Sequence, residues 1–296
     1  MSRFLHGQII AAFGRQYLVR LADGSEIACL TRGKKSEVAC GDMVEVQRTA
    51  DPSTELRTGA QAVIERIAPR RSLLHRSDAF REKLIAANVT QIIVVVAAEP
   101  SFSDELLARC LVAAYDQKLD VLIVLNKCDL LDAAAAARKR LIPYTAIGYR
   151  VLELSAKQDV SALPPFLHGH TSVLVGQSGM GKSTLINALL PDAQAATREI
   201  SAALDSGKHT TTHARLYRID ETSSLIDCPG VQAFGLHHLS FGGIEQGFVE
   251  FAQYLGQCRF HDCRHVHEPG CALRNAVAAG KIDARRLELF QQIAGR

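Results

Sequence analysis

No segment of this chain has the roughly 20 consecutive apolar residues that a membrane-spanning helix needs. The opening residues, Met1-Ser2-Arg3-Phe4, do not lead into the apolar stretch of a secretory signal peptide. Internal repeats and low-complexity tracts are absent as well. We therefore expect a cytoplasmic protein with no membrane partner.

The chain also lacks a strong net charge and a framework of paired cysteines. Its formal charge is only +3, which does not by itself indicate a nucleic-acid partner. Basic residues gather after residue 258 and at Arg70, Arg71 and Arg76, where a phosphate-rich partner and a solvated surface are equally open interpretations. Five of the eight cysteines are scattered and three crowd near the C-terminus. This usage favours a reducing compartment and a local metal site.

A length of 296 residues, 47% of them hydrophobic, suffices for about two domains with cores, plus smaller modules. The first part of the chain consists of short apolar segments separated by turns. We predict strands at residues 7–13, 16–21, 26–30, 43–48 and 62–67. Five short strands favour a small barrel of the OB type, and an SH3-like barrel is the alternative. The basic loop 32–35 either contacts a nucleic-acid backbone or is solvated.

Residues 88–260 alternate between buried-strand patterns and helical patterns. Strands are predicted at 91–98, 121–125, 151–154, 172–175, 216–219 and 224–227, and helices at 104–118, 133–140 and 182–190. Such alternation predicts a doubly wound α/β sheet. Helical periodicity at 244–255 and 283–293 predicts a helical C-terminal part. The expected domains are a barrel at 1–68, an α/β domain at 69–240 and a helical metal-binding domain at 241–296.

The run from residue 176 to residue 183 fits the phosphate-binding P-loop pattern G-x-x-x-x-G-K-[ST]. Its glycines let consecutive backbone N–H groups point at phosphate oxygens, while Lys182 meets the β- and γ-phosphates and Ser183 ligates Mg²⁺. The run lies between a predicted strand and a predicted helix, as this loop requires. The expected phosphate-binding residues are Gly176, Gln177, Ser178, Gly179, Met180, Gly181, Lys182, Ser183 and Thr184.

A second pattern, N-K-x-D, predicts that the base is guanine. The Asp129 carboxylate can accept hydrogen bonds from the N1–H and N2–H₂ groups of guanine, whereas adenine would leave it unpaired. Lys127 can lie over the base, and Asn126 can brace the loop. Ser155-Ala156-Lys157, at the end of the next predicted strand, can supply a backbone N–H to the guanine O6.

A third pattern, D-x-x-G, follows the predicted strand 224–227. In it Asp227 would hold Mg²⁺ through water, and the Gly230 N–H would contact the γ-phosphate. Of the threonines at 210–212, we expect Thr211 or Thr212 to complete the Mg²⁺ coordination, and an ordinary polar loop is the alternative.

Hydrolysis is expected to be slow, because the residue after Gly230 is Val231, where many GTPases have a water-orienting glutamine. His209 is the candidate catalytic substitute. A structural or RNA-facing role for this histidine is equally open.

The order of these patterns is reversed relative to most GTPases, because the base-reading pattern precedes the P-loop. This order indicates a circular permutation, which is feasible because domain termini often lie close together. The D-x-x-G segment then leads directly into the C-terminal part. We hypothesise that the nucleotide state moves that part as a lever.

Near the C-terminus, Cys258, Cys263, His265 and Cys271 supply three thiolates and one imidazole within fourteen positions. This donor set suits one tetrahedral, structural Zn²⁺. His261 and His267 are alternative ligands. Free cysteines packed in a small core are the remaining alternative.

Together with the runs 207–212 and 268–271, these motifs resemble the circularly permuted ribosome small-subunit-dependent GTPase A family over nearly the whole chain. The resemblance implies a cytoplasmic bacterial GTP hydrolase, with GTP and GDP as ligands. It would act late in maturation of the small (30S) ribosomal subunit, bind 16S rRNA and be stimulated by that subunit. It also places the zinc ligands on the four residues just named. Cys228 departs from the usual Ser or Thr, but its side chain is not a required ligand.

We expect a monomer. Two alternative functions stay open at this point. One is an RNA-binding module in which GTP is mainly a structural or regulatory ligand, and the other is a P-loop kinase or ATPase.

Overall fold

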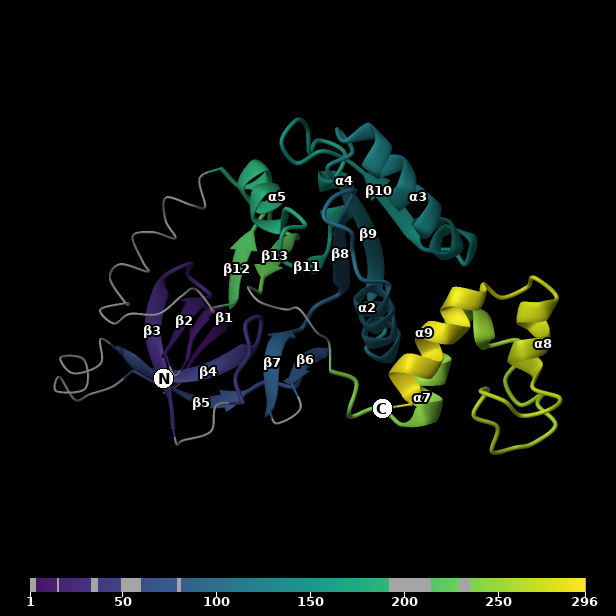
Figure 1. The fold of residues 1–296 in the computed structure, drawn as a ribbon. Coiled ribbons are helices and arrows are strands. Elements are labelled where there is room, and N and C mark those ends of the chain that lie inside the picture. The colour runs from purple at the N-terminus through teal and green to yellow at the C-terminus, as the bar shows by residue number, and fades with distance from the viewer. Residues whose placement is uncertain are drawn as a thin grey trace.

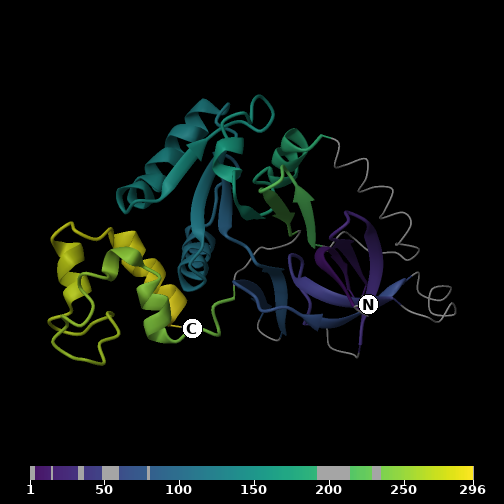
Figure 2. The same cartoon turned by 180° about the vertical axis from the view of Figure 1, so that it is seen from behind.

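The computed structural model of the chain describes residues 4–14, 16–32, 37–48, 60–78, 81–191, 214–228 and 235–295. A β-barrel, a central sheet with helices and a C-terminal helical module follow one another along the sequence (Figure 1). The barrel and the C-terminal module lie on opposite sides of the central sheet, as the view from behind also shows (Figure 2). The domain limits 1–68, 69–240 and 241–296 stay predictions.

The N-terminal barrel has the five strands that the turn pattern predicts. They are β1 (Leu5–Phe13), β2 (Gln16–Leu21), β3 (Glu26–Thr31), β4 (Met43–Arg48) and β5 (Ala62–Ile67). The sheet closes because β4 pairs with β1 as well as with β5. Alternate residues such as Ile9, Val19 and Val46 point inward and are fully buried, as the two-residue period of a strand requires. The OB-type barrel is thus confirmed.

The central sheet is mostly parallel and confirms the predicted α/β fold. Its strands are β8 (Gln91–Ala97), β9 (Asp120–Asn126), β10 (Arg150–Glu153), β11 (Thr171–Val175), β12 (Ala214–Arg218) and β13 (Ser224–Asp227). They lie in the order β10-β9-β8-β11-β13-β12, and only β12 runs antiparallel to its neighbour in this group. Every residue of β8 is buried, which explains its unbroken apolar sequence.

Among the described residues, four helices belong to this central part: α2 (Asp104–Asp116), α3 (Leu131–Ala146), the short α4 (Pro164–Leu167) and α5 (Lys182–Leu189). Helix α2 begins where predicted, because the Ser103 side chain accepts a hydrogen bond from the Leu106 N–H. Helix α3 is longer than predicted and continues through Pro143.

The barrel and the central sheet share hydrogen bonds, a feature that no sequence pattern indicated. Strand β12 pairs with β1 through Ala11–Arg215 and Ala12–Ala214, so that eleven strands form one continuous sheet. In the segment after β5, the guanidinium of Arg70 contacts both oxygens of the Asp42 carboxylate of the barrel at 2.7 Å. The strand β12 is therefore held directly by the barrel.

The sequence analysis missed a hairpin and misplaced a helix. Strands β6 (Leu73–Asp78) and β7 (Arg81–Ala87) form a separate two-stranded sheet, and their charged composition hid the strand pattern. The predicted helix 244–255 is wrong, because α7 (Phe241–Gln246) ends before Gly247. There the chain packs so closely on α2 that a Cβ at Gly247 would lie 2.8 Å from the Val112 Cγ1 atom.

The rest of the C-terminal module comprises the short 3₁₀ helix η1 (Val249–Phe251), α8 (Ala272–Ala278) and α9 (Ala284–Ala294). Its core is aromatic: the rings of Phe248, Phe251 and Phe290 are fully buried and lie 5.2 to 5.5 Å apart. None of the helices in the described ranges is long and apolar enough to span a bilayer.

Replacing Asp42 by Ala should loosen the barrel, because it leaves Arg70 and the Ala39 N–H without the carboxylate that they contact. Asp42 is fully buried, so we expect a loss of about 3 kcal/mol in local stability. Native-state hydrogen exchange of the β1 and β4 amides measures it. Glu26→Ala, which removes an exposed pair with Arg20, should cost less than about 1 kcal/mol. Equal exchange in the two variants would contradict this role of Asp42.

Candidate functional site

The parallel strands bring the three nucleotide patterns to one edge of the central sheet. Strand β9 ends at Asn126, β11 leads into the P-loop, and β13 ends at Asp227. Strand β8 separates β9 and β10 on one side from β11 and β13 on the other. Ligands of open α/β sheets bind at such a switch point, beyond the carboxyl ends of the strands. The base-reading and phosphate-binding halves therefore face a common position.

The P-loop has the tight backbone that its glycines predict. Gly176 and Gly181 have φ angles of 149° and 87°, in the region that favours glycine. A Cβ atom at Gly176 would lie 2.2 Å from the Val95 carbonyl oxygen, and one at Gly181 would lie 2.3 Å from the Asn126 Nδ2 atom. Helix α5 begins directly after this loop, so its N-terminus adds a partial positive charge to the site.

Lys182 and Asp227 form the charged part of the phosphate half. The Lys182 amine donates to the Gly176 and Gln177 carbonyl oxygens at 2.6 and 2.8 Å. Burial lowers the pKa of this amine, and the nearby Asp227 carboxylate opposes the shift. Burial also raises the pKa of Asp227, which Lys182 opposes in turn. Ser183, in the first turn of α5, is exposed. The amine and the carboxylate thus lie near each other, as binding of a phosphate with its cation requires.

The side chain of Asn126 joins three separate motifs. Its Nδ2 atom donates to the Met180 carbonyl oxygen of the P-loop at 2.9 Å. Its Oδ1 atom accepts from the backbone N–H groups of Lys127 at 2.8 Å and Ala156 at 2.9 Å. Asn126 is only 1% exposed, so these bonds form without competition from water. The amide sets the distance between the base-reading loops and the phosphate loop.

The base-reading residues surround an exposed carboxylate. The Ser155 hydroxyl is the main cause of a lowered pKa at Asp129, and Lys157 and Lys127 act in the same direction. Asp129 therefore stays ionised and can accept two hydrogen bonds from a planar donor pair. The Lys127 amine donates to the Glu99 carbonyl oxygen at 2.7 Å, which places its stem beside the same loops.

Several predicted site residues lie outside the described residues. They are His209, Thr211, Thr212 and Gly230, together with Val231. Their roles stay predictions.

The predicted metal ligands form a compact cluster in the C-terminal module. The ligand atoms of Cys258, Cys263, His265 and Cys271 all lie within 4.8 Å of one another. The His265 Nδ1 atom is 3.3 Å from the Cys271 sulfur and 3.6 Å from the Cys258 sulfur. Tetrahedral Zn²⁺ with bonds of about 2.1–2.3 Å needs ligand separations of this size. The cluster could hold a zinc ion. His261 and His267 are exposed and are not part of it.

A residue that the sequence analysis did not name orients the imidazole. The Glu245 carboxylate on α7 lies 2.6 Å from the His265 Nε2 atom, and this contact leaves Nδ1 for a metal. Twenty positions separate the two residues, and no spacing rule signals the pair. Glu268 fixes the loop itself, since its carboxylate accepts from the N–H groups of Arg264, Val266 and His267. These hydrogen bonds lower the pKa of Glu268 to about 2, and the bond from the Arg264 N–H has the largest effect.

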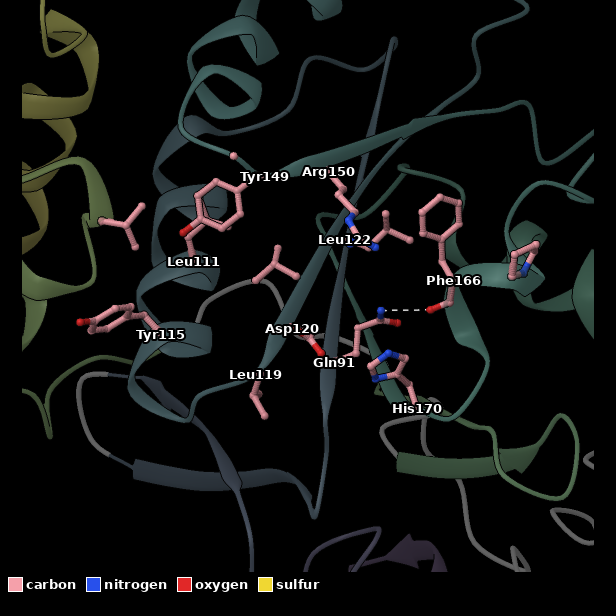
Figure 3. Close-up of a pocket in the computed structure, with 14 residues that line it drawn as sticks. Gln91, Leu111, Tyr115, Leu119, Asp120, Leu122, Tyr149, Arg150, Phe166 and His170 are labelled. Atoms are coloured by element: carbon pink, nitrogen blue, oxygen red, sulfur yellow. Dashed lines mark hydrogen bonds between the residues drawn. The ribbon is translucent and has the colours of Figure 1, made fainter.

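A cavity of about 650 Å³ lies at the opposite edge of the sheet, near the first residues of β8, β9 and β10 (Figure 3). Tyr115, Tyr149 and Phe166 contribute aromatic walls. Within the described part of the chain, no residue of the nucleotide motifs lines this cavity, so it is separate from the site described above.

Comparison with known proteins shows the family of this chain. A family model described as RsgA GTPase matches residues 67–237, which is more than half of the chain. The chain belongs to the RsgA GTPase family. Two relatives are named small ribosomal subunit biogenesis GTPase RsgA. The one from Nitrosospira multiformis is 56% identical over 98% of this chain and 90% of its own length. The one from Burkholderia pseudomallei strain K96243 is 53% identical over 97% and 90%.

Solved structures support the circular permutation. YjeQ from Thermotoga maritima has a TM-score of 0.71 and 29% identity, and the match covers 99% of both chains. YloQ, described as a circularly permuted GTPase, has a TM-score of 0.68 and 26% identity, over 99% of this chain and 94% of its own. The fold of this chain thus matches that of a circularly permuted GTPase, as its order of motifs indicated.

Asn126→Asp should abolish the bridge between the two halves of the site. A carboxylate cannot donate to the Met180 carbonyl oxygen and would repel it, at a cost of about 2 kcal/mol or more. We expect GDP to bind at least about tenfold more weakly, measured by titration calorimetry. Asn275→Asp, on the exposed face of α8, is the matched control and should bind GDP as the natural chain does. Unchanged affinity in Asn126→Asp would refute the bridging role.

Glu245→Gln should weaken zinc binding about 10- to 100-fold, because the neutral amide supports the imidazole less well than the carboxylate. Competition with a chromophoric chelator measures the zinc affinity directly. Glu288→Gln, an exposed carboxylate in the same module, should leave the affinity unchanged. Identical zinc affinities in both variants would show that Glu245 does not orient His265.

Proposed function

We propose that this chain hydrolyses GTP to GDP and phosphate in the biogenesis of the small ribosomal subunit. The observation that supports GTP hydrolysis is the position of the Asn126 side chain, which joins a guanine-reading loop to a P-loop in one site. The biogenesis role rests on relatives at 51–56% identity, which are named small ribosomal subunit biogenesis GTPase RsgA.

The residue roles within this site are also part of the proposal. Asp129 reads guanine, with Lys127 over the base and the 155–157 loop at its O6 atom. The P-loop residues 176–184 hold the phosphates through backbone N–H groups and the Lys182 amine. Ser183, Asp227 and Thr211 or Thr212 hold the Mg²⁺ that accompanies GTP. Gly230 contacts the γ-phosphate, and His209 is the candidate that positions the attacking water.

We further propose that intrinsic hydrolysis is slow and that the small subunit accelerates it at a late stage of maturation. Contact with 16S rRNA is supported by the exposed surface of the C-terminal module. Phe260 and Val266 are apolar side chains exposed there, and Arg259 and Arg264 lie over aromatic rings at 5.6 and 4.5 Å. Aromatic and guanidinium groups of this kind stack on unpaired bases and contact phosphates. A cytoplasmic monomer with one structural Zn²⁺ completes the proposal.

Lys182→Ala should reduce the rate of GTP hydrolysis about 100-fold, because the amine that stabilises the phosphate charge is lost. The assay compares the rate of phosphate release with and without purified small subunits. Lys139→Ala, an exposed lysine on α3, is the matched control. We expect a slow basal rate, a subunit-stimulated rate, and neither in Lys182→Ala. A fast basal rate that subunits do not change would contradict the proposal.

Asp129→Asn tests the base. An amide presents a donor where the carboxylate only accepts, so preference should shift from guanine to xanthine nucleotides. Competition between GDP and XDP for the protein measures it. If the variant prefers GDP over XDP by the same affinity ratio as the natural chain, Asp129 does not read the base.

The alternative is an RNA-binding module in which GTP is mainly a structural or regulatory ligand. Equal affinity for small subunits with GDP and with a non-hydrolysable GTP analogue would favour that alternative.

A further inference from the structure

The connection that leads from β8 into α2, residues 99–104 with Asp104 as the first residue of the helix, contacts both halves of the nucleotide site. Its Glu99 carbonyl oxygen accepts from the Lys127 amine of the base-reading loop at 2.7 Å. Its Ser103 N–H donates to the Gln177 Oε1 atom of the P-loop at 2.7 Å. Between them, Pro100 lies against Gly179, where a Cβ would be 3.3 Å from the Pro100 Cγ atom. This connection thus contacts both the base-reading loop and the P-loop.

The same connection is held from the other side by two arginines. Arg140 of α3 donates to the Ser101 hydroxyl at 2.6 Å, to the Phe102 carbonyl oxygen at 2.7 Å and to the Asp104 carboxylate at 2.7 Å. Asp104 also lies 3.6 Å from the Arg285 Nε atom, which belongs to α9 of the C-terminal module. The first turn of α2 therefore links the nucleotide loops to that module.

Helix α2 is packed against the C-terminal module beyond its first turn. The Cα of Gly247 lies so close to Val112 that any Cβ there would be 3.0 Å or less from three of its atoms. Further along, the Asp116 carboxylate is 3.7 Å from the Nε2 atom of His238, in the segment that leads into the module. Since packed interiors do not deform continuously, α2 and the module are expected to shift together.

A buried arginine fixes the module to α3 as well. Arg286 of α9 is 2% exposed and donates to both oxygens of Glu250, at 2.6 and 3.2 Å. Its guanidinium lies 5.2 Å from the centre of the Tyr144 ring on α3. The module therefore packs against α2 and α3 in addition to its covalent link to the segment after β13.

We propose that Gln177 is a positioning residue that couples nucleotide binding to the packing of the C-terminal module against α2 and α3. Through Ser103, it fixes the P-loop to α2, and the module packed on α2 keeps that helix in the position that the P-loop needs. The contacts that carry this coupling all lie within the described residues. This coupling rests on the proposed nucleotide site. Thermodynamic linkage makes it reciprocal, so bound GDP stabilises the packing of the module against α2 and α3.

The first test is a double-mutant cycle on GDP affinity, measured by titration calorimetry. Gln177→Ala removes the acceptor of the Ser103 N–H, and Gly247→Ala forces the module away from Val112. Each should weaken GDP binding about fivefold, the low end of typical coupling energies. The double variant should be no weaker than the poorer single variant, because both changes break one connection. Additive losses would overturn the proposal.

Arg285→Ala provides a milder disturbance on the module surface, far from the nucleotide residues along the chain. Because this arginine is half-exposed, we expect GDP to bind about twofold more weakly. Arg274→Ala, on the exposed face of α8, is its matched control and should not change the affinity. If Gly247→Ala does not fold, the cycle is run with Arg285→Ala, whose effect should vanish in the Gln177→Ala background.

Hydrogen exchange distinguishes coupling from a merely structural role of Gln177, because a structural role would not change how GDP protects the amides of the module. In the natural chain, GDP at saturating concentration should slow exchange of the α7 and α9 amides. In Gln177→Ala, also saturated with GDP, this protection should be lost while exchange at β11 and α5 still slows. Full protection of α9 in that variant would show that the coupling runs elsewhere. Absence of GDP binding in the natural chain would instead refute the proposed function itself.

Discussion

The buried amide of Asn126 is the interaction on which the rest of the nucleotide site depends. It is the only side-chain type of its size that can donate to the P-loop carbonyl of Met180 while accepting from two N–H groups. Those partners belong to loops that follow three different strands. If one bond is missing, a polar group stays buried without a partner, at a cost of about 1–3 kcal/mol. The amide therefore selects one relative placement of loops that the chain order separates.

This placement explains how a permuted chain keeps a working site. The parallel strands set which loops share an edge, and the order in which the chain visits them matters little. What the permutation changes is the connections. Strand β12 is bonded to the barrel through β1, and the C-terminal module is seated on α2 and α3. The nucleotide site thus has a folded part attached on each side. Strand β12 pairs with β13, which ends at Asp227, and α3 follows the base-reading loop.

The sequence predicted those features whose chemistry is local. A P-loop, a guanine-reading loop and a Cys₃His set each need particular residues at short spacing, and the first two were found in the predicted strand and helix context. The buried strand β8 followed from its apolar run. Contacts between distant segments were not predictable. The Glu245–His265 pair spans twenty positions, the close approach of Gly247 involves Val112 of another helix, and the β1–β12 pairing depends on two strand edges meeting. Helical periodicity alone favoured a continuous helix where α7 ends and the short η1 follows.

The central claim is that one site, assembled from two halves of the chain, selects guanine nucleotides. The most direct test is titration calorimetry of the natural protein with GDP and with ADP, each in the presence of Mg²⁺. The account predicts a single GDP site with an affinity at least about 100-fold above that for ADP, because adenine would leave the Asp129 carboxylate unpaired. Equal affinities for the two nucleotides, or no binding of either to the folded protein, would contradict it.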